Sequence, residues 1–296
     1  MNLSFINFHY IREIKPPQGI YPKTISEFSE QIKKLSENYV FLNQEEVIEG
    51  FFKPSDRNMC VITFDDGLKE QIKAVEYLHS KNIRPICFVS MEPLTKSIVL
   101  ETHKLHVIRS LISDQDFVNK VKKINSFTRF DVDKSILLKQ YRYDSFDIAK
   151  AKYFLNFKLE RPEKKEFLDS LFIHTVGMKE SEFSEKFYMN KNDLINLSKI
   201  ADIGSHAVSH TPLGSLSSEE ALKEMKESKA FLDDIIGKPI KSISYPFGGR
   251  SALPKVTDSE IENLGYEFGL TMIRGSNDLP LSNSKYFLRR YDTNDL

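Results

Sequence analysis

Two histidines stand four residues apart in the stretch SHAVSH, which runs from Ser205 to His210 in a chain that has only seven histidines. If the chain turns helical or forms a tight loop after His206, the two imidazoles project from the same side and can share one metal ion. The alternative is a pair of unrelated histidines on the surface or in the core. The spacing alone leaves both interpretations open.

Two aspartates follow an apolar stretch in the sequence ITFDDG. Asp65 and Asp66 come directly after a strand predicted at 59–64, and Gly67 opens a turn. An isolated Asp-Asp-Gly sequence is usually a turn, because these residues favour local hydrogen bonds and positive φ angles. A third polar stretch, SYPFGG at 244–249, also follows a predicted strand and by itself indicates only a turn.

The three stretches carry more weight together, because each lies at the carboxyl end of a different predicted strand. In a parallel α/β fold these ends meet at one edge, where active sites assemble. Asp66, His206 and His210 would then form a three-ligand site with an open position for water, as in hydrolytic zinc centres. Zinc is the expected ion, although such a site also accepts cobalt, nickel or iron. Asp65 is left to act as general base on the water.

Apolar strands alternate with amphipathic helices along the chain. Thr24 with Glu27 and Ser217 with Glu220 form capping boxes at the starts of two predicted helices, and Gly237 ends the second. The alternation predicts parallel strands joined by right-handed crossovers, either in a barrel or in an open doubly wound sheet. Strands are predicted at 5–11, 59–64, 83–90, 201–206, 242–247 and 266–273.

The chain changes character between about residues 100 and 189. Gly177 is the only glycine there, charged residues are frequent, and segments such as DFVNKVKKI and PEKKEFLDSLFIHTV have a helical pattern. We predict a helical insertion at about 100–189 within a single catalytic domain that spans 1–296.

The overall composition excludes some classes of partner. Lys and Arg together number 42, as do Asp and Glu, so no net charge draws the protein to nucleic acid or anionic lipid. We see neither a signal peptide nor an apolar run of membrane-spanning length, which predicts a cytoplasmic protein. Cys60 and Cys87 lie in apolar runs and are expected to be buried, reduced thiols. The oligomeric state stays open.

The stretches TFDDG, SHAVSH and YPFG, in this order, resemble the first three motifs of the polysaccharide deacetylase family, the group of the NodB homology domain and carbohydrate esterase family 4. The sequences FHYI, NDLINLSKIADIGSH and LRRYD add to the resemblance, which covers roughly 1–95 and 185–296. It implies a distorted (β/α)7 barrel and metal-dependent hydrolysis of an N-acetyl group on a sugar.

The resemblance also implies residue roles that agree with the chemistry of the side chains. Asp65 matches the family's catalytic base, and Asp66, His206 and His210 match its metal ligands. In the third motif, Phe247 matches the position whose backbone N–H helps to hold the oxyanion.

The neighbours of Phe247 in the third motif are weaker candidates. Tyr245, Pro246 and Gly248 share the motif and are candidate substrate-binding residues. Alone, this stretch has the composition of an ordinary Pro-Gly turn. Its assignment therefore depends on the resemblance and on the two stronger motifs.

The sequence departs from the family pattern at the residue that braces the base. Where the third motif usually carries an arginine, this chain has Ser244. Arg290, in LRRYD, is the predicted substitute, and Arg250 and Arg289 are weaker alternatives.

A second departure concerns the general acid that protonates the departing amine. The family's late motif with a catalytic histidine is missing, because no histidine follows His210. His9, at the end of the first strand, and His106, which forms the sequence HKLH with His103, are the candidates. Each could equally be an ordinary buried or surface histidine, and the proton could also come from water.

These observations favour a metal-dependent carbohydrate N-deacetylase. We expect its substrate to be a small or carrier-linked amino sugar, such as a cytosolic precursor in surface-glycan biosynthesis. One alternative is a deformylase or another small-amide hydrolase with the same site. The other is a non-catalytic carbohydrate-binding barrel.

Overall fold

The computed structural model describes all residues except 1, 51–56, 142–143, 282–283 and 296. Seven parallel strands follow one another in the order β1, β3, β4, β5, β6, β7 and β9, and β9 pairs back onto β1. The sheet therefore closes, and the predicted distorted (β/α)7 barrel is confirmed. The barrel strands are β1 Asn2–Phe8, β3 Asn58–Phe64, β4 Ile86–Val89, β5 Asp202–Ser205, β6 Ser242–Ser244, β7 Phe268–Arg274 and β9 Leu288–Asp292.

Strand β9 was not among the predicted strands, which numbered six. Its sequence, LRRYD, lacks the apolar run that marks the others, yet it pairs with both β7 and β1 and closes the barrel. Two short strands extend the sheet near the amino-terminal ends of the barrel strands. Strand β2 (Tyr39–Phe41) pairs parallel with the start of β3, and β8 (Asn277–Asp278) pairs antiparallel with the start of β1.

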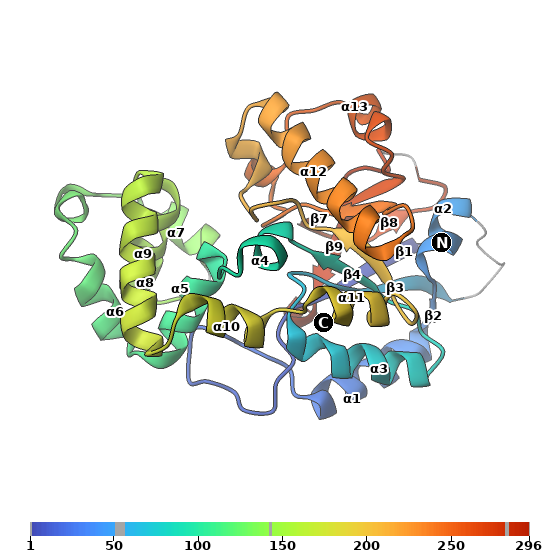
Figure 1. The fold of residues 1–296 in the computed structure, drawn as a ribbon, viewed down its shortest axis with the longest axis horizontal. Coiled ribbons are helices and arrows are strands. Elements are labelled where there is room, and N and C mark those ends of the chain that lie inside the picture. The colour runs from blue at the N-terminus through green and yellow to red at the C-terminus, as the bar shows by residue number, and fades with distance from the viewer. Residues whose placement is uncertain (1, 51–56, 142–143, 282–283, 296) are drawn as a thin grey trace. The chain divides into compact units, whose positions relative to one another are not determined.

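Helices surround the barrel (Figure 1). The capping boxes of Thr24 with Glu27 and of Ser217 with Glu220 are confirmed, as is the end of α12 at Gly237, whose φ is 70°. The helices of this part of the chain are α1 Ile25–Asn38, α2 Gln44–Glu49, α3 Ile72–Ser80, α4 Met91–Lys96, α10 Glu180–Phe187, α11 Lys191–Leu197, α12 Ser218–Ile236 and α13 Asp258–Asn263.

Alternate residues of each strand face different layers, as the period of two requires. In β1, Ile6 and Phe8 pack in one hydrophobic cluster with Phe28 of helix α1, whereas Leu3 and Phe5 belong to a second cluster built mainly from the barrel strands. The second cluster fills the barrel.

The barrel interior is apolar at one end and polar at the other. Phe88 of β4 fills so much of the apolar part that a Cβ added to Gly204 of β5 would lie 2.3 Å from its ring. The next inward-facing residue after Phe5 in β1 is Asn7, and the next after Leu288 in β9 is Arg290. Polar side chains thus replace apolar ones toward the carboxyl ends of the strands.

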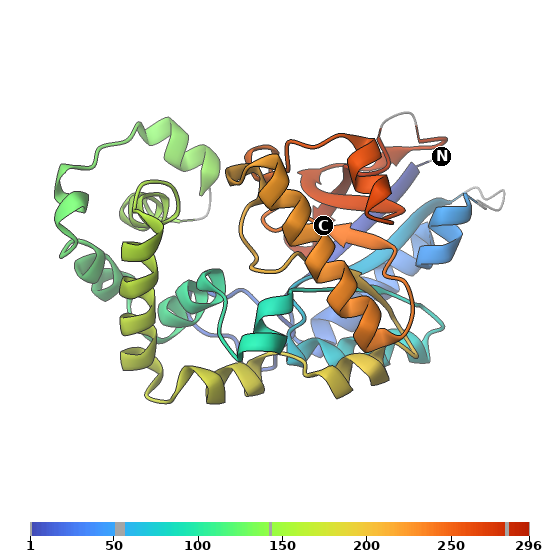
Figure 2. The ribbon, with the colours of Figure 1, turned by 45° about the horizontal axis from the view of Figure 1, so that its top comes forward.

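Residues 15–21 and 99–180 form a second compact unit, which we call the helical unit. Its described residues form helices and turns (Figure 2), as predicted for the insertion, and Phe117, Leu155, Leu168 and Phe172 lie in its core. Its helices are α5 Glu101–Leu111, α6 Asp114–Val121, α7 Lys134–Gln140, α8 Phe146–Phe157 and α9 Arg161–Val176. The unit ends at Glu180, earlier than the end predicted for the insertion. The predicted single catalytic domain stays a prediction.

Candidate active site

The carboxyl ends of β3 and β5 bring the predicted metal ligands together. The Nε2 atoms of His206 and His210 lie 3.4 Å and 3.2 Å from Oδ1 of Asp66. One donor atom from each of the three residues lies within 4.8 Å of the other two. All three side chains are largely buried, so their donor atoms face one another rather than bulk solvent.

The surroundings of these residues fit a divalent metal ion. Nδ1 of His206 lies 2.7 Å from the carbonyl oxygen of Ser244, a contact that fixes the ring orientation and directs Nε2 toward Asp66. Burial would lower the pKa of His206, but the charges of Asp65 and Asp66 outweigh it and raise the pKa. The local field therefore favours a cation, and two imidazoles with one carboxylate form a donor set typical of zinc.

The site loops have a strained backbone. Asp66, Ala207, His210 and Phe247 have φ angles of 79°, 57°, 56° and 63°, and they are four of the six non-glycine residues with positive φ in the described chain. Such conformations cost roughly 1–3 kcal/mol each and persist only where the surrounding structure holds them. Their concentration in the three motif loops indicates that the loops are held for a function.

Arg290, which we predicted as a possible brace of the base, pairs with Asp65. Its Nη1 and Nη2 donate to Oδ1 and Oδ2 of Asp65 at 2.9 Å and 2.7 Å, and neither side chain is appreciably exposed. Arg289 and Arg250, the weaker alternatives, are exposed. The structure thus pairs Asp65 with the arginine from β9.

Ser244 fits this arrangement because its side chain is small. Its hydroxyl accepts a hydrogen bond from Arg290 at 2.7 Å and donates one to Asp65 at 3.1 Å. Burial would raise the pKa of Asp65, but Arg290 and His206 outweigh it and lower the pKa to about 2. Asp65 is therefore ionised at neutral pH.

Of the candidate acids, His9 lies near Asp65, with Asn7 between them. Its Nε2 is 3.4 Å from Nδ2 of Asn7, which in turn donates to Asp65 at 3.1 Å. On its other side, Nδ1 of His9 lies 3.9 Å from a carboxylate oxygen of Asp292. The ring is about one-third exposed, so it is open to a ligand. His106 lies on α5 in the helical unit.

The third motif places Phe247 against the ligand set. Its ring centroid lies 5.1 Å from that of His210, and 47% of the residue is exposed. Gly248 allows the loop to approach β7, because an added Cβ would lie 2.4 Å from the backbone nitrogen of Met272. Pro246 is buried.

Tyr245 does not face the opening of the site. It has no exposed surface, its hydroxyl donates to the carbonyl of Tyr286 at 2.9 Å, and its ring stacks on Phe287. Its side chain belongs to the layer between strands and helices, and this placement gives no support to a direct contact with substrate.

Comparisons with known proteins point to polysaccharide deacetylases. A family model described as polysaccharide deacetylase matches residues 189–269, which contain the second and third motifs. Deacetylases are also among the solved structures that share the fold. The resemblance to the polysaccharide deacetylase family is confirmed. A search of curated proteins found no significant match.

The solved deacetylases match almost the whole chain at low sequence identity. Deacetylase PplD of Streptococcus pyogenes, in complex with acetate, has a TM-score of 0.60 and 16% identity over 99% of this chain and 92% of that one. Polysaccharide deacetylase BC0361 from Bacillus cereus gives 0.55 and 17% over 99% and 65% of the two chains. The BpsB deacetylase domain from Bordetella bronchiseptica gives 0.54 and 15% over 98% and 95%. These similarities show the fold.

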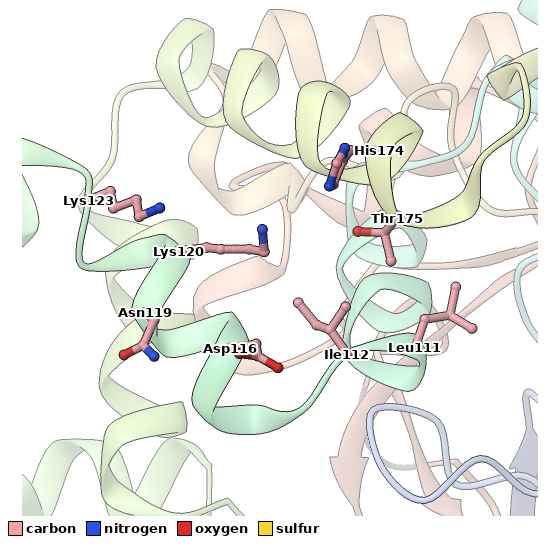
Figure 3. A pocket seen from close by; sticks show the side chains of 8 residues that line it. All are labelled: Leu111, Ile112, Asp116, Asn119, Lys120, Lys123, His174 and Thr175. Atoms are coloured by element: carbon pink, nitrogen blue, oxygen red, sulfur yellow. The ribbon is translucent and has the colours of Figure 1, made fainter.

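The helical unit contains a cavity of about 460 Å³. Figure 3 shows Lys120, in the last turn of α6, and Lys123, just beyond that helix, extending toward His174 and Thr175 near the end of α9. Cations are favoured near helix carboxyl ends, which gives the lysines a structural reason for this position. None of the predicted site residues lines this cavity.

None of the helices in the described part of the chain is long and apolar enough to cross a membrane.

Asn7 and Gln71 hold the candidate site in place and were not among the residues predicted from the sequence. Asn7 accepts hydrogen bonds from Thr63 and Arg290 and donates to Asp65. The side-chain amide of Gln71 donates to the carbonyls of His9 and Asp65, which ties the ends of β1 and β3 together. Asn7 had a signal in the sequence, because it is a polar residue at an inward position of a strand that is otherwise apolar.

Proposed function

We propose that this chain is a metal-dependent hydrolase that removes the N-acetyl group from an amino sugar. The proposal rests on one observation: a candidate metal site and a buried ion pair lie together at the carboxyl end of the barrel. Asp66, His206 and His210 form the candidate metal site, and the buried Asp65–Arg290 pair lies beside it. A ligand set and an oriented carboxylate are what amide hydrolysis at a metal centre requires.

Each residue has a defined part in this proposal. A divalent ion, zinc in our proposal, supplies Lewis acidity toward the amide carbonyl when bound by Asp66, His206 and His210. Asp65 accepts a hydrogen bond from the attacking water and takes its proton, while Arg290 keeps the carboxylate in one orientation. The backbone N–H of Phe247 stabilises the negative charge that develops on the carbonyl oxygen.

The direct test is release of acetate from N-acetylated amino sugars. We expect acetate, not formate, and expect activity on a free, nucleotide-linked or lipid-linked sugar rather than on long polymer. A chelator should abolish the release, and zinc, cobalt, nickel or iron should restore it, because the ligand set accepts each of these ions. Formate release would favour a deformylase, and hydrolysis of polymer alone would contradict a precursor substrate.

His9 is the proposed general acid, oriented by Asp292. Replacing His9 with glutamine should lower turnover by about 10²–10⁴ if it protonates the departing amine. Asp292→Asn should give a smaller loss of the same kind, because it removes the charge that faces Nδ1 of His9.

His106→Gln is the matched control, because it tests the second candidate from the sequence. Turnover should stay near that of the unchanged protein. Loss of turnover in this variant, with normal turnover in His9→Gln, would assign the acid to the helical unit instead.

A further inference from the structure

One carboxylate holds the short loop between the two histidines of the candidate metal site. Oε2 of Glu224, on helix α12, accepts hydrogen bonds from the backbone nitrogens of Val208 and Ser209, both at 2.9 Å. Its Oε1 accepts a third from the hydroxyl of Ser209 at 2.8 Å. Two consecutive N–H groups that point at one anionic oxygen form a concave anion site, and here a side chain of the same protein occupies it.

The other side of the loop is held by its carbonyl groups. The backbone nitrogens of Met91 and Glu92, at the start of α4, donate to the carbonyls of Ala207 and Val208 at 3.2 Å and 3.0 Å. Hydrogen bonds from α4 therefore hold two carbonyl groups of the loop, and Glu224 of α12 holds two of its N–H groups.

This double attachment matters because the loop is conformationally unfavourable. Ala207 and His210, which flank Val208 and Ser209, both have left-handed φ angles although neither is glycine. Without Glu224, two backbone N–H groups would lose their acceptor and the loop could relax toward ordinary angles. Because His210 ends the loop, such a relaxation would move its Nε2 relative to Asp66, from which it lies 3.2 Å.

We propose that Glu224 is a positioning residue that sets metal affinity by holding His210 in its ligating orientation. The inference rests on the proposed function only in that both need a metal at Asp66, His206 and His210. Residues that orient metal ligands by hydrogen bonds commonly change metal affinity by about 10–100-fold when they are replaced. A purely structural role would instead lower the stability of the metal-free protein and leave the affinity of the folded fraction unchanged.

The test measures metal affinity and stability separately on the full chain. Glu224→Ala and Glu224→Gln are compared with Glu227→Gln, an exposed position one turn away on the same helix whose partner is Lys223. Zinc affinity is measured by competition with a chromophoric chelator, the geometry by the visible spectrum of the cobalt-loaded protein, and the stability of the metal-free form by urea unfolding.

We expect Glu224→Ala to weaken zinc binding by about 10–100-fold and to alter the cobalt spectrum. Glu224→Gln should lie between, because its amide keeps one acceptor oxygen, and Glu227→Gln should match the unchanged protein. If Glu224→Ala fails to fold, Glu224→Gln decides. Unchanged zinc affinity and an unchanged cobalt spectrum in the folded Glu224 variants would overturn the proposal.

The outcome is separable from the fate of the proposed function. If zinc binding weakens in the Glu224 variants but no N-acetyl sugar is hydrolysed by the unchanged protein, the positioning role stands and the deacetylase function fails. If the unchanged protein releases acetate and the variants keep its zinc affinity, only the role of Glu224 fails.

Discussion

Replacing Asp65 with asparagine is expected to lower the rate of acetate release by a factor of about 10²–10⁴ while zinc stays bound. Asparagine keeps the shape of the side chain but is not basic, so it does not take the proton of the attacking water. The metal ligands Asp66, His206 and His210 are untouched. Turnover and the zinc content of the purified variant are the two measurements.

The Asp65→Asn variant also separates an enzyme from a binding protein. A non-catalytic carbohydrate-binding barrel would keep its ligand affinity in this variant, whereas a hydrolase would lose turnover. Ser244→Ala is the matched control, because it removes one hydrogen bond to Asp65 and leaves the carboxylate and Arg290 in place. We expect a much smaller loss there. Full turnover in Asp65→Asn would assign the base to another residue.

The part of the site that could be predicted from the sequence consists of residues that directly follow strands. A parallel barrel brings the carboxyl ends of its strands to one rim, so residues that directly follow strands, such as Asp66 and His206, had to lie near each other. The spacing within SHAVSH then placed His210 beside them.

The parts that the sequence did not reveal depend on tertiary contacts between distant segments. Strand β9 has no apolar run, because Arg290 takes an inward position and is neutralised by Asp65, which follows β3 on the far side of β1. A strand that buries a charged residue lacks the apolar pattern by which strands are recognised in a sequence. Glu224 was missed for a related reason, since on helix α12 its charge is typical of a solvated face.

Tyr245 shows the opposite error. Its place between Ser244 and Pro246 in a motif loop suggested a contact with substrate, but the period of two turns its side chain away from the barrel interior, where Ser244 lies. The side chain packs under the helices and donates to Tyr286. Proximity in sequence to a functional residue therefore predicts proximity of the backbone, not the direction of the side chain.

Replacing Arg290 with methionine should lower the free energy of unfolding of the metal-free protein by about 3–5 kcal/mol, the largest effect on stability that we predict. The variant leaves the Asp65 carboxylate buried without its bidentate partner, and it also removes donors to Thr271 and Ser244. Urea unfolding of the metal-free form measures the change without a contribution from ligand binding.

Arg289→Met is the matched control for this prediction, because Arg289 precedes Arg290 on the same strand and its side chain is exposed. Its cost should stay within about 0.5 kcal/mol, as for most surface substitutions. The double variant Asp65→Leu/Arg290→Met should be more stable than Arg290→Met alone, because it removes the unpaired buried charge instead of leaving it in place. If Arg289→Met and Arg290→Met lowered the free energy of unfolding equally, Arg290 would not stabilise the buried Asp65 carboxylate. The proposal that Arg290 orients the catalytic base would then be wrong.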